Sequence, residues 1–258
     1  MYQAHSAFTE PENPNVKVWR YMDFTKFISM LDSSSLYFTR ADHFEDPFEG
    51  ATTDAILQKR NSLYTNFFDV DEAREKILAE SNMYRNLRLQ YAINCWHENE
   101  HESAAMWKLY LQSSEGVAIC STFSKLKQSF NYCGRNINLG RVKYIDFKTD
   151  DITEGHYTDQ HPIVYKRKSF EHEREIRAVI WEPGEVDFDA LMEKGGKKPI
   201  EAIKHGLQIQ TDLQELINTV YVAPNAPGWF RDLVEQMILR YSYKIEVIQS
   251  SLYTGAMF

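Results

Sequence analysis

Apolar residues recur along this chain with two periods in turn, and this alternation constrains the fold more than any other feature. In residues 24–31 they follow the i, i+3, i+4, i+7 spacing of a buried helix face: Phe24, Phe27, Ile28 and Leu31. In residues 141–147 apolar and polar residues alternate instead, which is typical of a half-buried strand. Segments of both kinds are mixed along the chain, without an internal repeat. The sequence therefore predicts one α+β domain with a central, largely antiparallel sheet and surrounding helices.

The same patterns divide the chain into an arm, a domain and an insertion. Residues 1–15 are polar and include two prolines, so we expect a flexible N-terminal arm, followed by a single domain over residues 16–258. Further strands are expected at 16–21, 36–39, 91–96, 116–120, 175–182, 207–210, 219–222 and 244–248, and further helices at 103–111, 123–130 and 229–241. The charged, helix-like stretch at about 50–90 is expected to form a helical insertion or lid.

The composition of the 258 residues is that of a globular protein with an acidic surface. Hydrophobic residues make up 43% of the chain, which is enough for an ordinary core, and the formal net charge is −8. Such a charge argues against a broad nucleic-acid or anionic-membrane surface. No apolar run approaches the ~20 residues that cross a bilayer, and residues 1–15 lack a signal-peptide pattern. We expect a cytoplasmic protein whose partner is a small-molecule nucleotide or an unknown macromolecular target, with the oligomeric state left open.

The cysteines argue against a disulfide scaffold and a zinc ribbon. There are three, Cys95, Cys120 and Cys133, and no two of them have CxxC spacing. Cys95 and Cys120 stand in apolar, strand-like runs, where a buried free thiol is the usual outcome. We therefore expect no metal site built on cysteine.

A dense run of charge, KRKSFEHEREIR, spans residues 166–177 and precedes the apolar run 178–181. If residues 175–182 form a strand, Glu175, Arg177 and Val179 share one face, because side chains alternate with period 2. A buried carboxylate is costly unless it is paired or used. The pattern therefore leaves two hypotheses open for Glu173 and Glu175, catalysis or a structural ion network.

Four separated segments occur in one order along the chain. They are Trp19-Arg20-Tyr21, LYFTRADHFEDPFEG (36–50), NCWHENEHESAAMWKLYLQSSEGVAI (94–119) and KRKSFEHEREIRAV (166–179). Together they resemble a bacterial family called domain of unknown function 2971, over about residues 16–250. That family is similar in its D-P-F-E loop, its Met-Trp-x-x-Tyr helix and its late Glu-x-Glu-x-Arg stretch. The resemblance implies little about activity, since the family's own function is not defined.

A second resemblance is to the arginine-class ADP-ribosyltransferases. It rests on the order of Arg20 in an early strand, Ser121-Thr122 after a middle strand and Glu-x-Glu near a late strand. The resemblance implies NAD as cofactor, with Arg20 contacting its phosphates and Ser121 bracing the site. Tyr21 or Tyr37 would stack on the nicotinamide ring.

The same resemblance assigns the catalytic step to the late Glu-x-Glu. Glu175 would stabilise an oxocarbenium-like ribose cation, because positive charge develops there in the transition state. Glu173 would orient or deprotonate the acceptor nucleophile. Arg177 belongs to the segment expected to close the NAD cleft and is included among the cofactor contacts.

Two other hypotheses are drawn from the acidic residues. In the first, the carboxylates pair with neighbouring basic residues, and the chain is a non-catalytic ligand- or partner-binding module of a defence or stress system. In the second, a metal-dependent nuclease holds Mg²⁺ with Asp46, Glu49, Glu173 and Glu175. Against the nuclease, Asp46 is expected to form an Asx-turn before Pro47, and Glu49 to be solvated or paired with Arg40.

Two smaller motifs have simple interpretations. His97 and His101 have the His-x-x-x-His spacing of a zinc-binding helix, yet HENEHES is expected to be a polar loop between a strand and a helix. Met106, Trp107 and Tyr110 could stack on a base, but at helical spacing they are expected to belong to the core.

Overall fold

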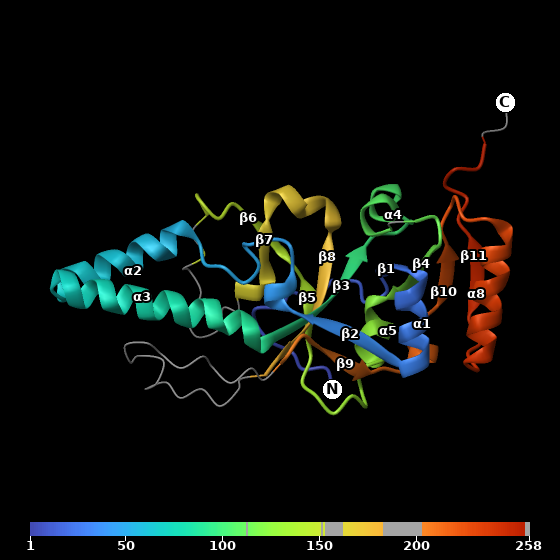
Figure 1. The fold of residues 1–258 in the computed structure, drawn as a ribbon, viewed down its shortest axis with the longest axis horizontal. Coiled ribbons are helices and arrows are strands. Elements are labelled where there is room, and N and C mark those ends of the chain that lie inside the picture. The colour runs from blue at the N-terminus through green and yellow to red at the C-terminus, as the bar shows by residue number, and fades with distance from the viewer. Residues whose placement is uncertain (112, 151, 153–161, 183–202, 256–258) are drawn as a thin grey trace.

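The computed structural model describes residues 1–111, 113–150, 152, 162–182 and 203–255 of the chain. Within them the chain forms a single α+β domain around a nine-stranded sheet (Figure 1). The strand order is β11-β10-β4-β1-β3-β2-β9, and β8 joins this path by pairing with both β3 and β5. All pairs in the sheet are antiparallel except β10–β11. The predicted fold class, with its largely antiparallel sheet, is confirmed.

Most strands fall close to the predicted ranges, but strands at 138–141 and 165–167 were not predicted. The strands of the sheet are β1 (Lys17–Asp23), β2 (Ser35–Arg40), β3 (Tyr91–Glu98), β4 (Gly116–Thr122), β5 (Asn138–Arg141), β8 (Glu175–Trp181), β9 (Gly206–Gln210), β10 (Thr219–Val222) and β11 (Glu246–Gln249). A separate parallel pair is formed by β6 (Lys143–Ile145) and β7 (Tyr165–Arg167). The single strand expected at 141–147 is thus two short strands. They are separated at Val142, whose N–H donates to the Glu175 carbonyl oxygen at 2.9 Å.

The helices also follow the apolar spacing of the sequence. They are α1 (Phe24–Ser33), α2 (Asp54–Phe67), α3 (Val70–Leu87), α4 (Ala104–Tyr110), α5 (Phe123–Gln128), α7 (Leu213–Leu216) and α8 (Gly228–Arg240). The described ranges also contain four 3₁₀ turns: η1 (Ala41–His43), η2 (Arg88–Gln90), η3 (Pro162–Val164) and η4 (Lys168–Glu173). In the described part of the chain, no helix combines the length and the apolarity that crossing a membrane requires.

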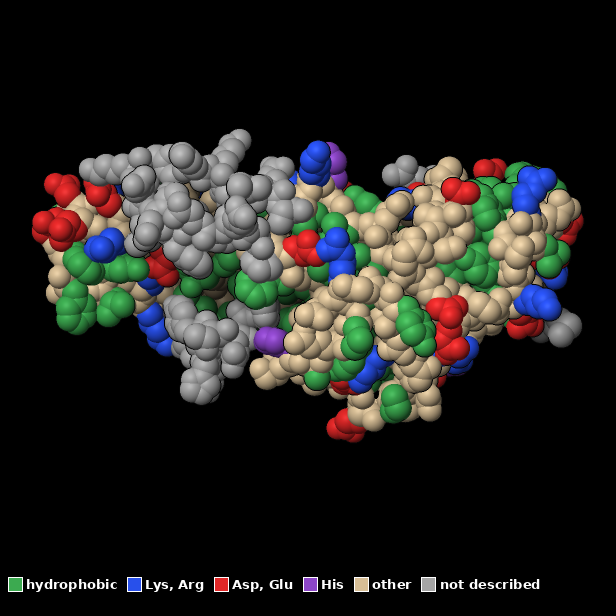
Figure 2. Space-filling model, turned by 90° about the horizontal axis from the view of Figure 1, so that it is seen from below, with side chains coloured by type: hydrophobic (Ala, Val, Ile, Leu, Met, Phe, Trp, Pro, Cys, Tyr) green, Lys and Arg blue, Asp and Glu red, His purple; other side chains and the backbone are tan. Residues whose placement is uncertain are grey.

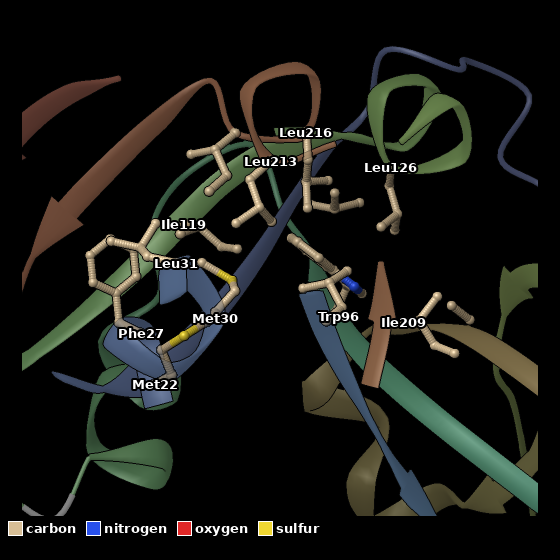
Figure 3. Packing of buried hydrophobic residues seen from close by; sticks show 14 of the residues in the cluster. Met22, Phe27, Met30, Leu31, Trp96, Ile119, Leu126, Ile209, Leu213 and Leu216 are labelled. Carbon is tan, nitrogen blue, oxygen red and sulfur yellow. The ribbon is translucent and has the colours of Figure 1, made fainter. Parts of the chain in front are cut away.

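The main core lies on one face of the sheet, where α1, α5, α7 and α8 pack (Figure 3). Trp96 of β3 and Phe27 of α1 are among its largest fully buried side chains. Figure 3 shows further core residues from the helices α1, α5 and α7 and from the strands β1, β4 and β9: Met22, Met30, Leu31, Ile119, Leu126, Ile209, Leu213 and Leu216. Apolar burial of this extent supplies the main driving force for folding.

The opposite face of the sheet carries two smaller apolar clusters. One contains Trp19 and Tyr21 of β1 and Trp107 of α4. The other contains Ile93 of β3 and Val179 of β8, covered by residues of β6, β7 and η3. Between the two clusters, on the same face, β3 and β8 carry charged and polar side chains.

Residues 1–15 are not a loose arm in this structure. Tyr2 forms a bridge with Ile137, and Thr9 forms one with Arg141 of β5. Phe8 is 8% exposed and joins one of the smaller clusters. The polar composition suggested a free segment, but backbone pairing and one buried aromatic ring attach it to the domain.

Helices α2 and α3 occupy the range expected for the helical insertion and project from the sheet as an antiparallel hairpin (Figure 1). Tyr64 Oη of α2 donates to Glu80 Oε2 of α3 at 2.7 Å, and Arg60 Nη2 donates to Ser81 Oγ at 3.0 Å. Polar side chains therefore join the two helices around Arg60 and Tyr64.

Candidate active site

The candidate site lies beside an opening in the sheet, next to β3. One edge of β3 pairs with β8 from residue 91 to residue 97. On its other edge, β2 pairs only at Ala92 and Ile93, and β1 only at His97 and Glu98. The two neighbours thus diverge beside residues 94–96 of β3. In this opening Arg20 Nη1 donates to the Cys95 carbonyl oxygen at 2.6 Å.

Lys166 joins the two glutamates of the charged segment. Its Nζ donates to Glu173 Oε2 at 2.5 Å and to Glu175 Oε2 at 3.0 Å. All three side chains are at most 9% exposed. Charge-assisted hydrogen bonds of this kind are short and strong in a dry environment. The ammonium group therefore fixes both carboxylates.

Arg177 forms the other half of the network. Its Nε donates to Glu175 Oε1 at 2.6 Å, and its Nη2 donates to Glu175 Oε2 at 3.2 Å and to Glu49 Oε2 at 2.9 Å. Its Nη1 donates to Glu49 Oε1 and to the Ile163 carbonyl oxygen. All five N–H donors of the guanidinium are thus used within the chain. The expectation that Arg177 contacts a cofactor is therefore not supported, because the group has no donor left.

The backbone between the two glutamates explains how both reach Lys166. Glu173 ends η4, and Glu175 begins β8, which is a change of direction within two residues. Arg174 lies between them with φ +40°, in the left-handed backbone region that residues other than glycine rarely adopt. Its N–H donates to the Glu171 carbonyl oxygen, and its own carbonyl accepts from the Glu98 N–H. These two bonds stabilise the strained turn.

His97 supports the same turn from the neighbouring strand. Its Nδ1 is 2.6 Å from the carbonyl oxygen of Glu173, so this nitrogen carries the proton and donates. Burial lowers the pKa of His97, which favours the neutral ring. His97 was expected in a polar loop, but it belongs to β3 and is 6% exposed. The polar residues that follow His97 in the sequence led to the prediction of a loop where β3 in fact continues.

The charges of the network determine its protonation. Burial by itself would raise the pKa of Glu175, but the Arg177 guanidinium and the Lys166 ammonium outweigh it and lower that pKa to about 2. The Glu175 carboxylate raises the pKa of Lys166 in turn, against the effect of burial. Glu175 is therefore ionised and Lys166 protonated at neutral pH.

Arg20 and Tyr110 approach this network from two other segments. The Arg20 guanidinium lies close enough to Cys95, Tyr110 and Glu175 to interact with them electrostatically. Burial, followed by the nearby Glu173 carboxylate, raises the pKa of Tyr110, although 43% of this residue is exposed. Tyr110 ends α4 and was expected in the core. It lies at the surface instead, beside the buried carboxylates.

Three polar groups here have unused hydrogen-bonding capacity. Among the residues that the structure describes, Glu173 Oε1, the Tyr110 hydroxyl, and Nε and Nη2 of Arg20 have no hydrogen-bond partner. The three residues come from η4, α4 and β1. A ligand reaching the opening would therefore meet an acceptor, a donor and a cation.

Ser121 is not brought to this place. The strand registers pair Trp19 with His97 and His97 with Glu175, which puts these three side chains on one face. Ser121 pairs with Val18 and so faces the other side. It is fully buried there, and its Oγ donates to the Leu216 carbonyl oxygen at 2.5 Å. The structure therefore offers it no contact with the glutamates.

The tyrosines expected to stack on nicotinamide are placed differently from each other. Tyr21 is 6% exposed, packs edge-on to Trp107 at 4.9 Å between ring centroids, and its hydroxyl accepts from the Ser103 N–H. It is part of the contact between β1 and α4. Tyr37 of β2 is 45% exposed. The structure instead brings Tyr110 and Tyr144 to the glutamates, and the Tyr144 hydroxyl accepts from the Glu175 N–H at 2.7 Å.

The D-P-F-E loop contributes two carboxylates to the charged segment. Asp46 forms the predicted Asx-turn, since its Oδ1 accepts from the Phe48 N–H at 3.0 Å, and it also pairs with Arg167 at 2.9 Å. The expectation that Glu49 is solvated or pairs with Arg40 is wrong. Glu49 is 1% exposed and pairs with Arg177. The order of the four motifs was the available signal for this contact, since all four meet here.

Two further observations concern possible ligands. No group of three or more His, Cys, Asp or Glu side chains in the described ranges is arranged to hold a metal ion. A surface hollow of about 440 Å³ lies elsewhere, between the N-terminal residues and α5, where Lys127 pairs with Glu10 at 3.0 Å.

Comparisons with known proteins found no match: no family model, no curated protein and no solved structure is similar enough to this chain to be matched.

Proposed function

We propose that this chain is an NAD-binding enzyme of the ADP-ribosyltransferase type, related to the domain of unknown function 2971 family. The observation that supports the proposal is the convergence of Arg20, Tyr110 and Glu173 on the ionised Glu175. These residues come from segments far apart in the sequence, and three of them have free polar atoms. Convergent polar groups beside a residue with a perturbed pKa are the usual mark of a functional site.

The charges of the site suit a ligand with both signs of charge. Lys166 and Arg177 are used in pairing Glu49, Glu173 and Glu175. Arg20 is left to attract an anion, while the free oxygen of Glu173 is left to attract a cation. NAD carries a negative pyrophosphate and a positive nicotinamide ring on one molecule. Tyr110 adds a partly exposed ring on which nicotinamide can stack.

The reaction would use the two glutamates unequally. The bond between ribose C1′ and the nicotinamide nitrogen breaks, and its electron pair leaves with nicotinamide. The free Glu173 oxygen stabilises the positive charge that develops on the ribose. An acceptor nucleophile then bonds to C1′ and releases its proton to the same carboxylate. Glu175 has both oxygens occupied and acts as a positioning residue through Lys166.

The test measures nicotinamide release from NAD, and transfer of phosphate-labelled ADP-ribose to protein, nucleic acid and small molecules of a bacterial lysate. We expect Glu173→Gln to lower both on the order of 100-fold. The matched control is Glu171→Gln, on the same 3₁₀ turn but exposed, which should keep full activity. Absence of nicotinamide release, together with no heat of binding at millimolar NAD, would falsify the proposal.

A non-catalytic ligand- or partner-binding module in defence or stress is the second candidate. The observation that favours it is the complete internal pairing of Arg177, which is what a structural network needs. Under this hypothesis the protein has no enzyme activity, and Glu173→Gln changes its stability. Action in the cytoplasm is part of both proposals, and the three free cysteines fit a reducing compartment.

A further inference from the structure

We propose that the end of the α2–α3 hairpin docks a basic, partly apolar segment of a partner protein. We call this surface the hairpin tip. It comprises four apolar residues, Leu63, Phe67, Phe68 and Val70, and four acidic residues, Asp69, Asp71, Glu72 and Glu75. Figure 2 shows hydrophobic and acidic side chains side by side at the end of the molecule that the hairpin forms.

The apolar part of the tip is exposed to an unusual degree. Leu63 is 54% exposed, Phe67 74% and Val70 84%, and Phe68 is 38% exposed. Exposing a whole apolar side chain forgoes about 1.5–3 kcal/mol of burial free energy. A cluster of such residues on one projecting element marks an interaction surface.

Of the four apolar residues, Phe68 takes part in the hairpin's own packing, with its ring centroid 6.0 Å from that of Tyr64, but other contacts join the helices and close the turn. The two helices are joined by Arg60, Tyr64, Glu80 and Ser81. The turn is closed by Asp69, whose Oδ1 accepts from the N–H groups of residues 71 and 72. None of the apolar tip residues belongs to a core cluster. Their exposure is therefore not explained by folding.

The negative charge around the hairpin tip determines which kind of partner segment can bind there. Val70 and the four acidic residues line a surface hollow of about 430 Å³. Clustered carboxylates repel nucleic acid and anionic lipid, and they repel the same tip of a second copy. They attract a segment that carries lysine or arginine beside apolar side chains. The chain already contains a small version of this contact, since Lys76 Nζ lies 4.5 Å from the centroid of the Phe68 ring.

The inference is independent of the proposed enzyme activity. The tip lies at the far end of the hairpin from the sheet, as Figure 1 shows, and the test uses binding alone. Activity and docking can therefore fail separately.

The experiment selects binders from a displayed library of random 16-residue peptides on the whole protein. Peptides that also bind a tip variant, Phe67→Ser with Val70→Ser, are removed. We expect the remaining peptides to carry net positive charge together with aromatic or aliphatic residues. Their affinity should fall at least tenfold in Asp71→Asn with Glu72→Gln, a variant that the selection does not use. It should also fall several-fold when salt is raised from about 0.05 to 0.3 M.

The matched control is Leu239→Ser with Asp232→Asn on α8, which removes an exposed apolar side chain and an exposed acidic one elsewhere. It should bind the selected peptides as the unchanged protein does, and circular dichroism should show equal helix content in all variants. Selection of neutral or acidic peptides would overturn the proposal. So would a dimer that dissociates in the tip variant, which assigns the surface to a second copy, or vesicle binding lost in that variant, which assigns it to a membrane.

Discussion

The substitution Arg177→Met removes the cation at the centre of the buried network while keeping a side chain of similar length. Four of the five hydrogen bonds of Arg177 go to carboxylate oxygens of Glu49 and Glu175. In the variant these carboxylates stay buried, at 1% and 3% exposure, without their common cation.

The structure indicates the size of the loss. Removing one partner of a buried ion pair costs about 3–5 kcal/mol of unfolding free energy. Lys166 still bonds Glu175 at 3.0 Å, and burial already raises the pKa of Glu49, which can take up a proton. Both effects lessen the penalty, so we expect a value near the lower end, about 3 kcal/mol.

The assay is urea unfolding followed by tryptophan fluorescence, with the free energy compared at equal m-value. The control is Lys168→Met, which breaks an ion pair with Asp150 whose side chains are 57% and 35% exposed, and which should cost about 1 kcal/mol or less. Adding Glu49→Gln to Arg177→Met should recover part of the loss, because it removes an orphaned charge. The reasoning is refuted if Arg177→Met costs no more than the control, or if the second substitution adds a further full loss.

Three other outcomes are expected. The pKa of Glu175 is lower in the folded state than the ordinary value near 4.5, so its ionisation stabilises the folded protein. This contribution to the unfolding free energy, about 3 kcal/mol, is present above pH 4.5 and is lost as the pH falls towards 2. The urea midpoint measured against pH should show this loss, and the curve should be flatter for Glu175→Gln. Arg174 has a strained φ of +40°, so Arg174→Gly should leave the unfolding free energy unchanged or raise it by up to about 1 kcal/mol. Arg174→Val should lower it by about 1–2 kcal/mol. Equal thermal midpoints for the two variants would contradict this expectation. Gly206→Ala places a Cβ 2.4 Å from the Phe38 carbonyl oxygen and should cost about 1–3 kcal/mol, while Gly228→Ala, with no atom within 4 Å, should be neutral or stabilising by calorimetry.

Local periodicity was sufficient for most of the sheet and helices. The apolar spacing in residues 24–31 predicted α1, and the alternation after Glu175 predicted β8 and the shared face of Glu175 and Arg177. These features depend on side-chain direction within one element, which the sequence encodes directly. Errors arose where polar residues are buried. The run that begins at His97 looks like a loop, yet His97 lies in β3, where its Nδ1 donates to the Glu173 carbonyl oxygen.

The pairing of motifs could not be predicted in the same way. Glu49 and Arg177 are 128 residues apart, and Glu49 was expected to be solvated or to pair with Arg40. Arg20 and Ser121 seemed equivalent as cofactor contacts, and strand register puts both on one face, since Arg20 follows Val18, the partner of Ser121, by two residues. Ser121 faces the opposite side of the sheet from Glu175, while Arg20 enters the opening between β1 and β3. Register and strand divergence depend on the whole sheet and not on any one segment.

Short-range patterns were enough to predict the α+β class, the position of most elements and the charged Glu-x-Glu-x-Arg stretch at the start of β8, because propensity and periodicity act over a few neighbouring residues. Which charges meet is set by the three-dimensional fold. It occupied every donor of Arg177, left an oxygen of Glu173 free and brought Tyr110 to the glutamates. Ion pairs in a dry interior depend on distances of a few ångströms between distant segments, and folding alone sets those distances.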